Sequence, residues 1–144
     1  MLIRRVFSMA ALVGLAVTVT ALPVLAQAAG VKAKVVFQVS DSDPAKWGLT
    51  LNNVRNAQAD LGEESIDVEI VAYGPGIAML KGDSSVAQRV SAALKTGVKV
   101  MACENTMNAQ HLAHADMLPN ISYVPAGVVE LILKQQQGYA YIRP

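Results

Sequence analysis

The sequence predicts a single three-layer α/β domain built on a mainly parallel, five-stranded sheet. Five short segments with the apolar and β-branched character of strands alternate with helix-like segments from Lys34 to the end of the chain. Glycine, proline and asparagine turns separate these segments, and no linker or internal repeat interrupts the alternation. At 144 residues and 53% apolar, the chain is long enough for one domain with a buried core.

The first 28 residues are predicted to be a cleaved signal peptide, which leaves 29–144 as the domain. Arg4 and Arg5 precede an almost wholly apolar run over 9–25, and Ala26-Gln27-Ala28 has the small-x-small pattern that signal peptidase requires. We therefore expect cleavage after Ala28, export to the periplasm and no stable membrane anchor. An uncleaved anchor and export by the twin-arginine route remain as alternatives.

The charge pattern gives no support to nucleic-acid binding. The formal net charge is +1, and Arg4 and Arg5 contribute to it. Without them the chain carries ten basic and eleven acidic side chains, with no basic cluster of the kind that binds phosphate groups. We expect no nucleic-acid partner.

The domain begins with a strand and a long helix. Residues 34–40 form a near-continuous apolar run, which is typical of a central strand covered on both faces. Asp41-Ser42-Asp43-Pro44 breaks this run, because the acids can cap a helix and proline suits its first position. The helix is predicted over 44–61, with Gly62 as its stop. Its buried face is predicted to carry Trp47, Leu51, Val54 and Leu61.

The second strand, over 66–73, alternates apolar and polar residues, which favours a place nearer the sheet edge. Gly74-Pro75-Gly76 follows it. This segment lacks the lysine and the glycine spacing of a nucleotide-binding loop, so a tight strand-to-helix turn is the better interpretation. Ser84 or Ser85 is predicted to cap a helix that runs to Thr96. Its apolar stripe comprises Val86, Val90, Ala93 and Leu94.

The third strand, over 97–103, ends on Cys103, the one cysteine of the chain. Asn105 and Thr106 are good N-cap residues, so a helix is predicted from Thr106 to Asp116. The thiol would then face the free amides and the positive end of that helix, which stabilise thiolate. The alternative is that Cys103 is a small buried apolar residue.

The chain ends with a strand over 121–124, a helix opened by Pro125-Ala126, and a closing strand over 139–142. That helix is apolar around more than half of its circumference. The residues concerned are Val128, Val129, Leu131, Ile132 and Leu133. Because its own sheet cannot cover so much apolar surface, the pattern predicts a contact between the subunits of a homo-oligomer.

Three strand-to-helix loops are expected to meet at the carboxyl edge of the sheet, because crossovers in parallel sheets are right-handed. These loops are 41–43, 74–76 and 103–105. Ligands bind in the crevice at that edge of open parallel sheets, so we predict Cys103 as the catalytic residue. The predicted binding residues are Asp41, Gly74, Gly76, Glu104, Asn105 and Thr106. Nothing in the sequence points to a bound cofactor.

Two histidines are weak candidates for a metal site. His111 and His114 lie three residues apart on the predicted helix, so that with Cys103 or Asp116 they could hold zinc or copper. Polar residues on a solvated helix face explain the pair as well, and we predict no metal site.

Four regions of the chain, in order, carry a resemblance to a known family. They are 51–56, 68–77, 97–106, and the ending formed by 124–131 with 138–142. Together they resemble the DsrE/DsrF-like family, including its YchN-type members. The resemblance implies a flavodoxin-like α/β sandwich and homo-oligomers, commonly trimers or hexamers. In the best understood branch of the family a cysteine carries a persulfide and relays sulfur, and that cysteine corresponds to Cys103.

Two functions are therefore predicted. In the first, the protein is an exported sulfur carrier or sulfurtransferase that holds a persulfide on Cys103 and exchanges sulfur with a donor or acceptor protein. In the second, it is a non-catalytic, homo-oligomeric module of the periplasm that binds a small ligand in the same crevice. One cysteine cannot close a disulfide within the exported chain, so Cys103 is buried and inert, paired to another chain, or reactive.

Overall fold

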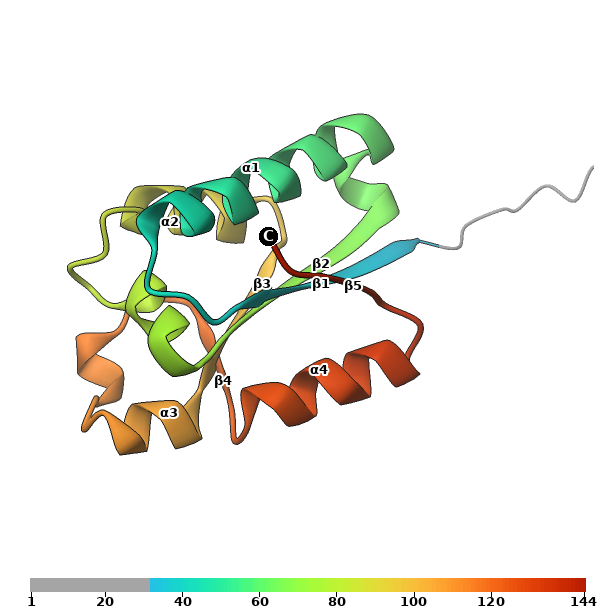
Figure 1. Ribbon diagram of the computed structural model, residues 1–144. Helices are drawn as coiled ribbons and strands as arrows, with labels where there is room; N and C mark the ends of the chain where they lie inside the picture. Colours follow the sequence, from blue (N-terminus) through green and yellow to red (C-terminus); the bar gives the residue numbers. More distant parts are fainter. Residues whose placement is uncertain (1–31) are drawn as a thin grey trace, which may run out of the picture.

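A computed structural model describes residues 32–144, and the predicted signal peptide lies outside them. The strands of this part form one five-stranded, all-parallel sheet in the order β4-β3-β2-β1-β5 (Figure 1). They are β1 (Ala33–Val39), β2 (Ile66–Ala72), β3 (Lys99–Cys103), β4 (Ser122–Val124) and β5 (Ala140–Ile142). The predicted parallel α/β architecture is confirmed.

Helices cover both faces of the sheet (Figure 1). On one face lie α1 (Pro44–Leu61) and α2 (Ala87–Lys95), and on the other lies α4 (Gly127–Gln136), with α3 (Glu104–Ala109) beside its start. Short 3-10 helices occur at Glu63–Ser65, Gly74–Leu80 and His114–Asp116. The result is the three-layer arrangement that alternating strands and helices predict.

The boundaries of α1 follow from its terminal residues. The Asp43 carboxylate accepts a hydrogen bond from the Ala45 amide at 2.8 Å, Pro44 occupies the first turn, and Gly62 ends the helix with φ +90°. The predicted range of 44–61 is confirmed. Leu61 does not lie on the buried face, because it is 53% exposed in the last turn and Gln58 is the last buried residue of the helix.

The two faces of the sheet differ in what they bury. The larger core lies on the side of α1 and α2, with Phe37, Ile70, Val90 and Val100 at most 1% exposed. The cluster under α4 is small. It comprises Val36, Val71, Leu131 and Tyr139. Few apolar side chains therefore lie between the sheet and α4, and polar side chains occupy the remaining space in this layer.

β2 is the central strand, so its predicted place near the sheet edge is wrong. β1 pairs with one side of it and β3 with the other. Of its polar residues, Glu69 is fully buried and Asp67 is partly buried. They face the α4 layer, where lysines from β3 and α4 pair with them. The alternation of polar and apolar residues in β2 therefore arises because its polar side chains pair with lysines under α4, and not because the strand lies at the sheet edge.

The helix after the cysteine begins earlier and is shorter than predicted. Cys103 itself occupies the N-cap position, so α3 begins at Glu104 rather than Thr106. It ends at Ala109, and His111 takes a positive φ of +56°, which a continuous helix does not allow. The predicted helix over 106–116 is therefore wrong beyond Ala109.

Two other helix starts move by one or two residues. Val86 is the N-cap of α2 in place of Ser84 or Ser85, although the Ser84 hydroxyl accepts from the Val86 amide at 3.4 Å. α4 begins at Gly127 rather than at Pro125. Gly97 and Gly138, with φ +81° and +84°, follow the ends of the two helices as predicted.

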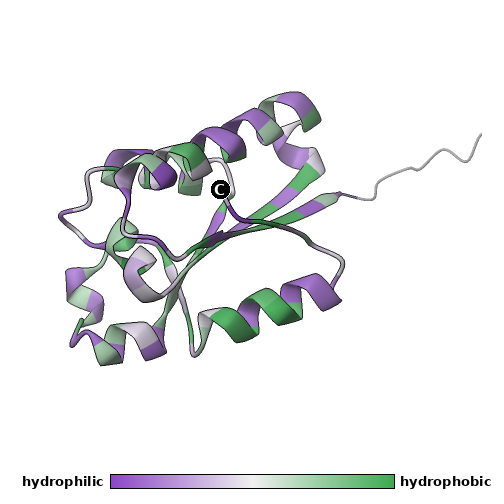
Figure 2. Ribbon diagram, viewed as in Figure 1, coloured by the Kyte–Doolittle hydropathy of each residue, from purple (hydrophilic) through white to green (hydrophobic). Residues whose placement is uncertain are grey.

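Much of α4 is hydrophobic in sequence (Figure 2), and most of its apolar side chains are exposed. Leu131 packs on the sheet, whereas the other apolar side chains of the helix point outward. Val128, Val129, Ile132 and Leu133 are between 43% and 54% exposed. Within residues 32–144, no helix combines the length and apolar character that crossing a membrane requires.

Candidate functional site

Cys103 lies at the carboxyl end of β3, on the face of the sheet that α4 covers. Cys103 is 4% exposed, and its sulfur lies beside Gly127, the first residue of α4. The Gly127 amide donates a hydrogen bond to the Cys103 Sγ at 3.2 Å. The thiol is thus buried but contacts a polar donor, unlike a cysteine in a purely apolar core.

The groups around the sulfur favour its ionised form. Burial raises the pKa of the Cys103 thiol, because it penalises a charge. The Thr106 hydroxyl and the amides of Gly127 and Thr106 are the main groups that outweigh burial, so the pKa of the thiol lies below its ordinary value. This direction agrees with the prediction from the strand-end position. The donors come from the starts of both α3 and α4, rather than from one helix alone.

The loop after β2 joins this site through Thr106. The Gly74 amide donates to the Thr106 Oγ1 at 2.9 Å, and the Gln110 side chain donates to the Gly74 carbonyl at 3.3 Å. The Gly76 amide donates to the Tyr73 carbonyl at 3.1 Å. Both glycine amides are therefore engaged within the chain, and Gly74 acts on the sulfur indirectly, by orienting the Thr106 hydroxyl.

Gly76 is required by packing against β1. A Cβ at this position would lie 2.2 Å from the Val39 carbonyl oxygen, which no side chain can tolerate. The adjacent Tyr73 amide donates to the same oxygen at 3.1 Å. The interpretation of Gly74-Pro75-Gly76 as a tight turn agrees with these contacts.

The sequence reasoning missed the fourth loop, between β4 and α4. The Asn105 amide donates to the Pro125 carbonyl at 3.1 Å, and Gly127 supplies the amide that reaches the sulfur. A Cβ on Gly127 would lie 3.0 Å from the Tyr73 Cβ, so only glycine fits comfortably between the Tyr73 ring and the site. The signal was available, because a parallel strand followed by a helix always places its loop at this edge.

Asp41 lies apart from the cysteine. Its loop follows β1, and β2 separates β1 from β3. The Asp41 carboxylate contacts the Lys46 Nζ at 3.2 Å and the Arg143 Nη2 at 3.6 Å. The hydrogen bond from Lys46 holds the pKa of Asp41 below its ordinary value. Asp41 is thus placed to pair with Lys46 and Arg143 rather than to contact the sulfur.

Glu104 points away from the sulfur. Its Oε1 lies 3.6 Å from the His114 Nε2, and the His114 ring stacks on Tyr123 with centroids 3.8 Å apart. The Glu104 carboxylate, which was predicted as a binding group, is therefore directed at an exposed histidine at the rim.

The two histidines do not share a helix, so the geometric basis for a metal pair is lost. His111 lies in the turn after α3 and His114 in the next short 3-10 helix. Within residues 32–144, no three His, Cys, Asp or Glu side chains gather as a metal site would require.

A cavity of about 320 Å³ lies between α1 and α2, on the opposite face of the sheet. Leu51, Val54 and Ala93 line it, with Arg55 and Arg89 among its polar residues. It is separated from Cys103 by the sheet. The reactive group and the cavity are therefore independent features.

The fold and the site together define a small flavodoxin-like α/β protein with one buried thiol at the carboxyl edge of its sheet. The chain belongs to the DsrE/DsrF-like family, whose model matches residues 33–144.

The solved structures that are similar to the chain include the following two. The protein of unknown function MTH1491 from Methanobacterium thermoautotrophicum is 38% identical, with a TM-score of 0.75; the match covers 78% of this chain and 100% of that protein. The ychN protein from E. coli is 16% identical, with a TM-score of 0.61, and the match covers 78% and 99% respectively. The second likeness bears on the fold alone. No curated protein matches the chain.

Proposed function

We propose that the protein is a sulfur carrier that holds a sulfane sulfur as a persulfide on Cys103. The observation that carries the proposal is the donor set around the sulfur, above all the Gly127 amide at 3.2 Å and the Thr106 hydroxyl. A thiolate is the nucleophile in sulfur exchange, and a persulfide anion needs the same donors. Membership of the DsrE/DsrF-like family supports the proposal.

The transfer needs no external oxidant. The Cys103 thiolate attacks the outer sulfur of a donor persulfide, RS–SH, so that a new S–S bond forms and the RS–SH bond breaks with its electron pair leaving on RS⁻. The product is Cys103–S–SH. An acceptor thiolate then attacks the outer sulfur and releases Cys103 as thiolate, which restores the starting state.

The burial of the thiol favours a second candidate, a non-catalytic module that binds a small ligand at the carboxyl edge. At 4% exposure the sulfur presents little surface to a donor. In this candidate the Cys103 thiol packs beside the Gly127 amide as a structural group and exchanges no sulfur. The two candidates differ in one chemical property, which is whether the folded protein accepts sulfur.

Export and assembly form part of the proposal. The pattern over residues 1–28 favours cleavage after Ala28 and a periplasmic protein. The N-terminal sequence of the mature protein is expected to begin at or near Ala29, and Met1 retained on a membrane-bound protein would contradict export as a cleaved chain.

The exposed apolar face of α4 supports a homo-oligomer, of which a trimer or hexamer is the form that the family resemblance implies.

Loading with a low-molecular-weight persulfide tests the function. The folded wild type is expected to gain the mass of one sulfur atom and to return it to an added thiol acceptor. Cys103→Ser, with the same fold by circular dichroism, is expected to gain nothing. A wild type that takes up sulfur only after denaturation would favour the binding module.

A further inference from the structure

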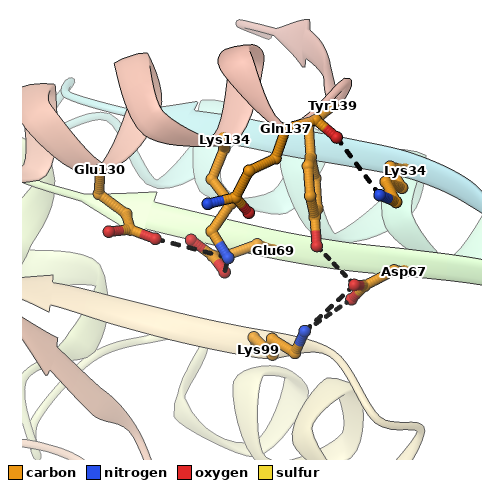
Figure 3. A network of polar contacts seen from close by, with 8 residues as sticks. All are labelled: Lys34, Asp67, Glu69, Lys99, Glu130, Lys134, Gln137 and Tyr139. Atoms are coloured by element: carbon orange, nitrogen blue, oxygen red, sulfur yellow. Dashed lines mark hydrogen bonds and ion pairs between the residues drawn. The ribbon is translucent and has the colours of Figure 1, made fainter.

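A buried ion pair joins α4 to the centre of the sheet (Figure 3). Glu69 of β2 is 0% exposed, and its Oε2 lies 2.6 Å from the Nζ of Lys134 on α4. Glu130, one helical turn earlier, lies 3.5 Å from the same Nζ. Apart from this contact with Lys134, neither oxygen of Glu69 has a hydrogen-bond partner within the described part of the chain, so Lys134 is the charge that compensates this carboxylate.

The ion pair is the main directional contact that α4 makes with the sheet. The apolar cluster under the helix is small, and Leu131 is its one large buried side chain from α4. Apolar contact alone lets a helix slide or rotate at little cost, whereas a desolvated charge pair fixes one position. Lys134 also lies 5.0 Å from the centre of the Tyr139 ring, whose hydroxyl donates to Asp67.

The same helix begins at the sulfur. Gly127 is the first residue of α4, and Lys134 follows seven residues later, about 10 Å along the helix axis. A helix of this length moves as a unit, so a shift at Lys134 displaces the Gly127 amide. A hydrogen bond weakens steeply with distance and angle, and a displacement of about 1 Å is enough to lose this contact.

We propose that the Glu69–Lys134 ion pair is a positioning device for the cysteine site: it fixes α4 on the sheet so that the Gly127 amide reaches the Cys103 sulfur. Glu69 and Lys134 are positioning residues rather than catalytic ones, because they act through the helix. The inference deepens the sulfur-carrier proposal, on which its functional meaning rests.

Glu69→Gln is the sharpest test, because positioning and simple electrostatics predict opposite signs. Removing a negative charge near the site lowers the pKa of a thiol by direct electrostatics. Loosening α4 weakens the contact between the Gly127 amide and the sulfur, and this loss raises the pKa of the thiol. We expect the pKa of Cys103, measured as alkylation rate against pH, to rise by about half a unit to one unit. The Gly127 amide resonance is expected to lose its dependence on Cys103 ionisation.

Lys134→Met provides the second variant and allows a charge-matched control. It is expected to raise the pKa of Cys103 by at least as much as Glu69→Gln does. Lys99→Met removes the same charge from the same face, about 13 Å along β3 from Cys103, but Lys99 pairs with Asp67 of the sheet rather than with α4. It is expected to leave the pH profile within about a fifth of a unit of the wild type. If Lys134→Met does not fold, the Glu69→Gln variant decides alone, because Lys134 keeps its ion pair with Glu130 when Glu69 is neutralised.

The outcomes separate this inference from the sulfur-carrier proposal. A lowered or unchanged thiol pKa in Glu69→Gln overturns the positioning role, whatever the wild type does with sulfur. Equal shifts in Lys134→Met and Lys99→Met overturn it too, because they show a charge effect. A wild type that never accepts sulfur overturns the carrier proposal, and a raised pKa with a released Gly127 amide still supports the positioning role.

Discussion

The Gly127 amide and the Cys103 sulfur lie 3.2 Å apart, although 24 positions separate the two residues in the sequence. Parallel pairing of β3 with β4 brings them together, since Cys103 lies opposite Val124 in the ladder and α4 starts three residues later. The sulfur therefore meets donors from two helix starts and from the Thr106 side chain.

Removal of the Thr106 hydroxyl is expected to raise the pKa of Cys103. Thr106→Val keeps the shape of the side chain but takes away a hydrogen bond to the thiolate, which is worth about one pKa unit. The rate of alkylation against pH reports the change. Thr106→Ser retains the hydroxyl and serves as the control. Equal profiles for the valine and serine variants would show that this hydroxyl does not act on the sulfur.

Gly76→Ala is expected to destabilise the fold strongly. Its Cβ would lie 2.2 Å from the Val39 carbonyl oxygen, so the end of β1 or the turn after β2 must move. We expect a loss of roughly 2–4 kcal/mol in the free energy of unfolding, measured with urea. Gly82→Ala is the matched control, because its Cβ would lie 3.5 Å from the nearest atom, the Asp116 carbonyl oxygen. A Gly76→Ala protein as stable as this control would refute the close approach.

Stability is expected to fall in alkali through Tyr139. Burial and the Asp67 carboxylate raise the pKa of Tyr139 to about 12, whereas an unfolded tyrosine titrates near 10. Between these values the unfolded chain has lost a proton that the folded chain keeps, so the free energy of unfolding decreases as pH rises. Urea denaturation from about pH 9 to about pH 11 measures the slope. Tyr139→Phe should show a shallower decline, and an unaltered slope would argue against this assignment.

The α4 face is expected to mediate assembly. Ile132→Glu places a charge on a side chain that is 49% exposed, so we expect the subunits to separate while each keeps its fold. Light scattering with circular dichroism measures both properties. Leu49→Glu is the control, because Leu49 is 46% exposed on α1, in the opposite layer. A wild type that is monomeric at micromolar concentration would remove the basis for this prediction. Leu131→Glu differs from Ile132→Glu, because Leu131 is 4% exposed and its loss is expected to disrupt folding.

The periodicity of the sequence was enough to predict the layers of the fold and the place of Cys103. Apolar alternation ending on a cysteine identifies the end of a strand, and α1 follows from Asp43, Pro44 and Gly62. The position of β2 could not be obtained in this way. The sequence does not show whether a polar residue such as Glu69 faces water or a buried lysine. Only the tertiary fold brings Lys134 next to it.

The composition of the site depends on contacts between distant segments, which local patterns do not report. Thr106 was predicted from its capping potential, and its hydroxyl and amide lower the pKa of the Cys103 thiol. Gly127 was not predicted, because the loop between β4 and α4 was not counted among the loops at the carboxyl edge, although the topology places it there. The prediction that His111 and His114 share one helix is wrong for a local reason, since nothing in the sequence around His111 shows that its backbone leaves the helical region.

The intact mass of the protein purified from its native compartment, under conditions that preserve persulfides, tests the central claim most directly. The account predicts a species heavier than the mature chain by one sulfur atom, with the addition mapped to Cys103, removed by a thiol reductant and absent from Cys103→Ser. A wild type that carries no added sulfur, and whose thiol reacts with alkylating reagents only after denaturation, would contradict it.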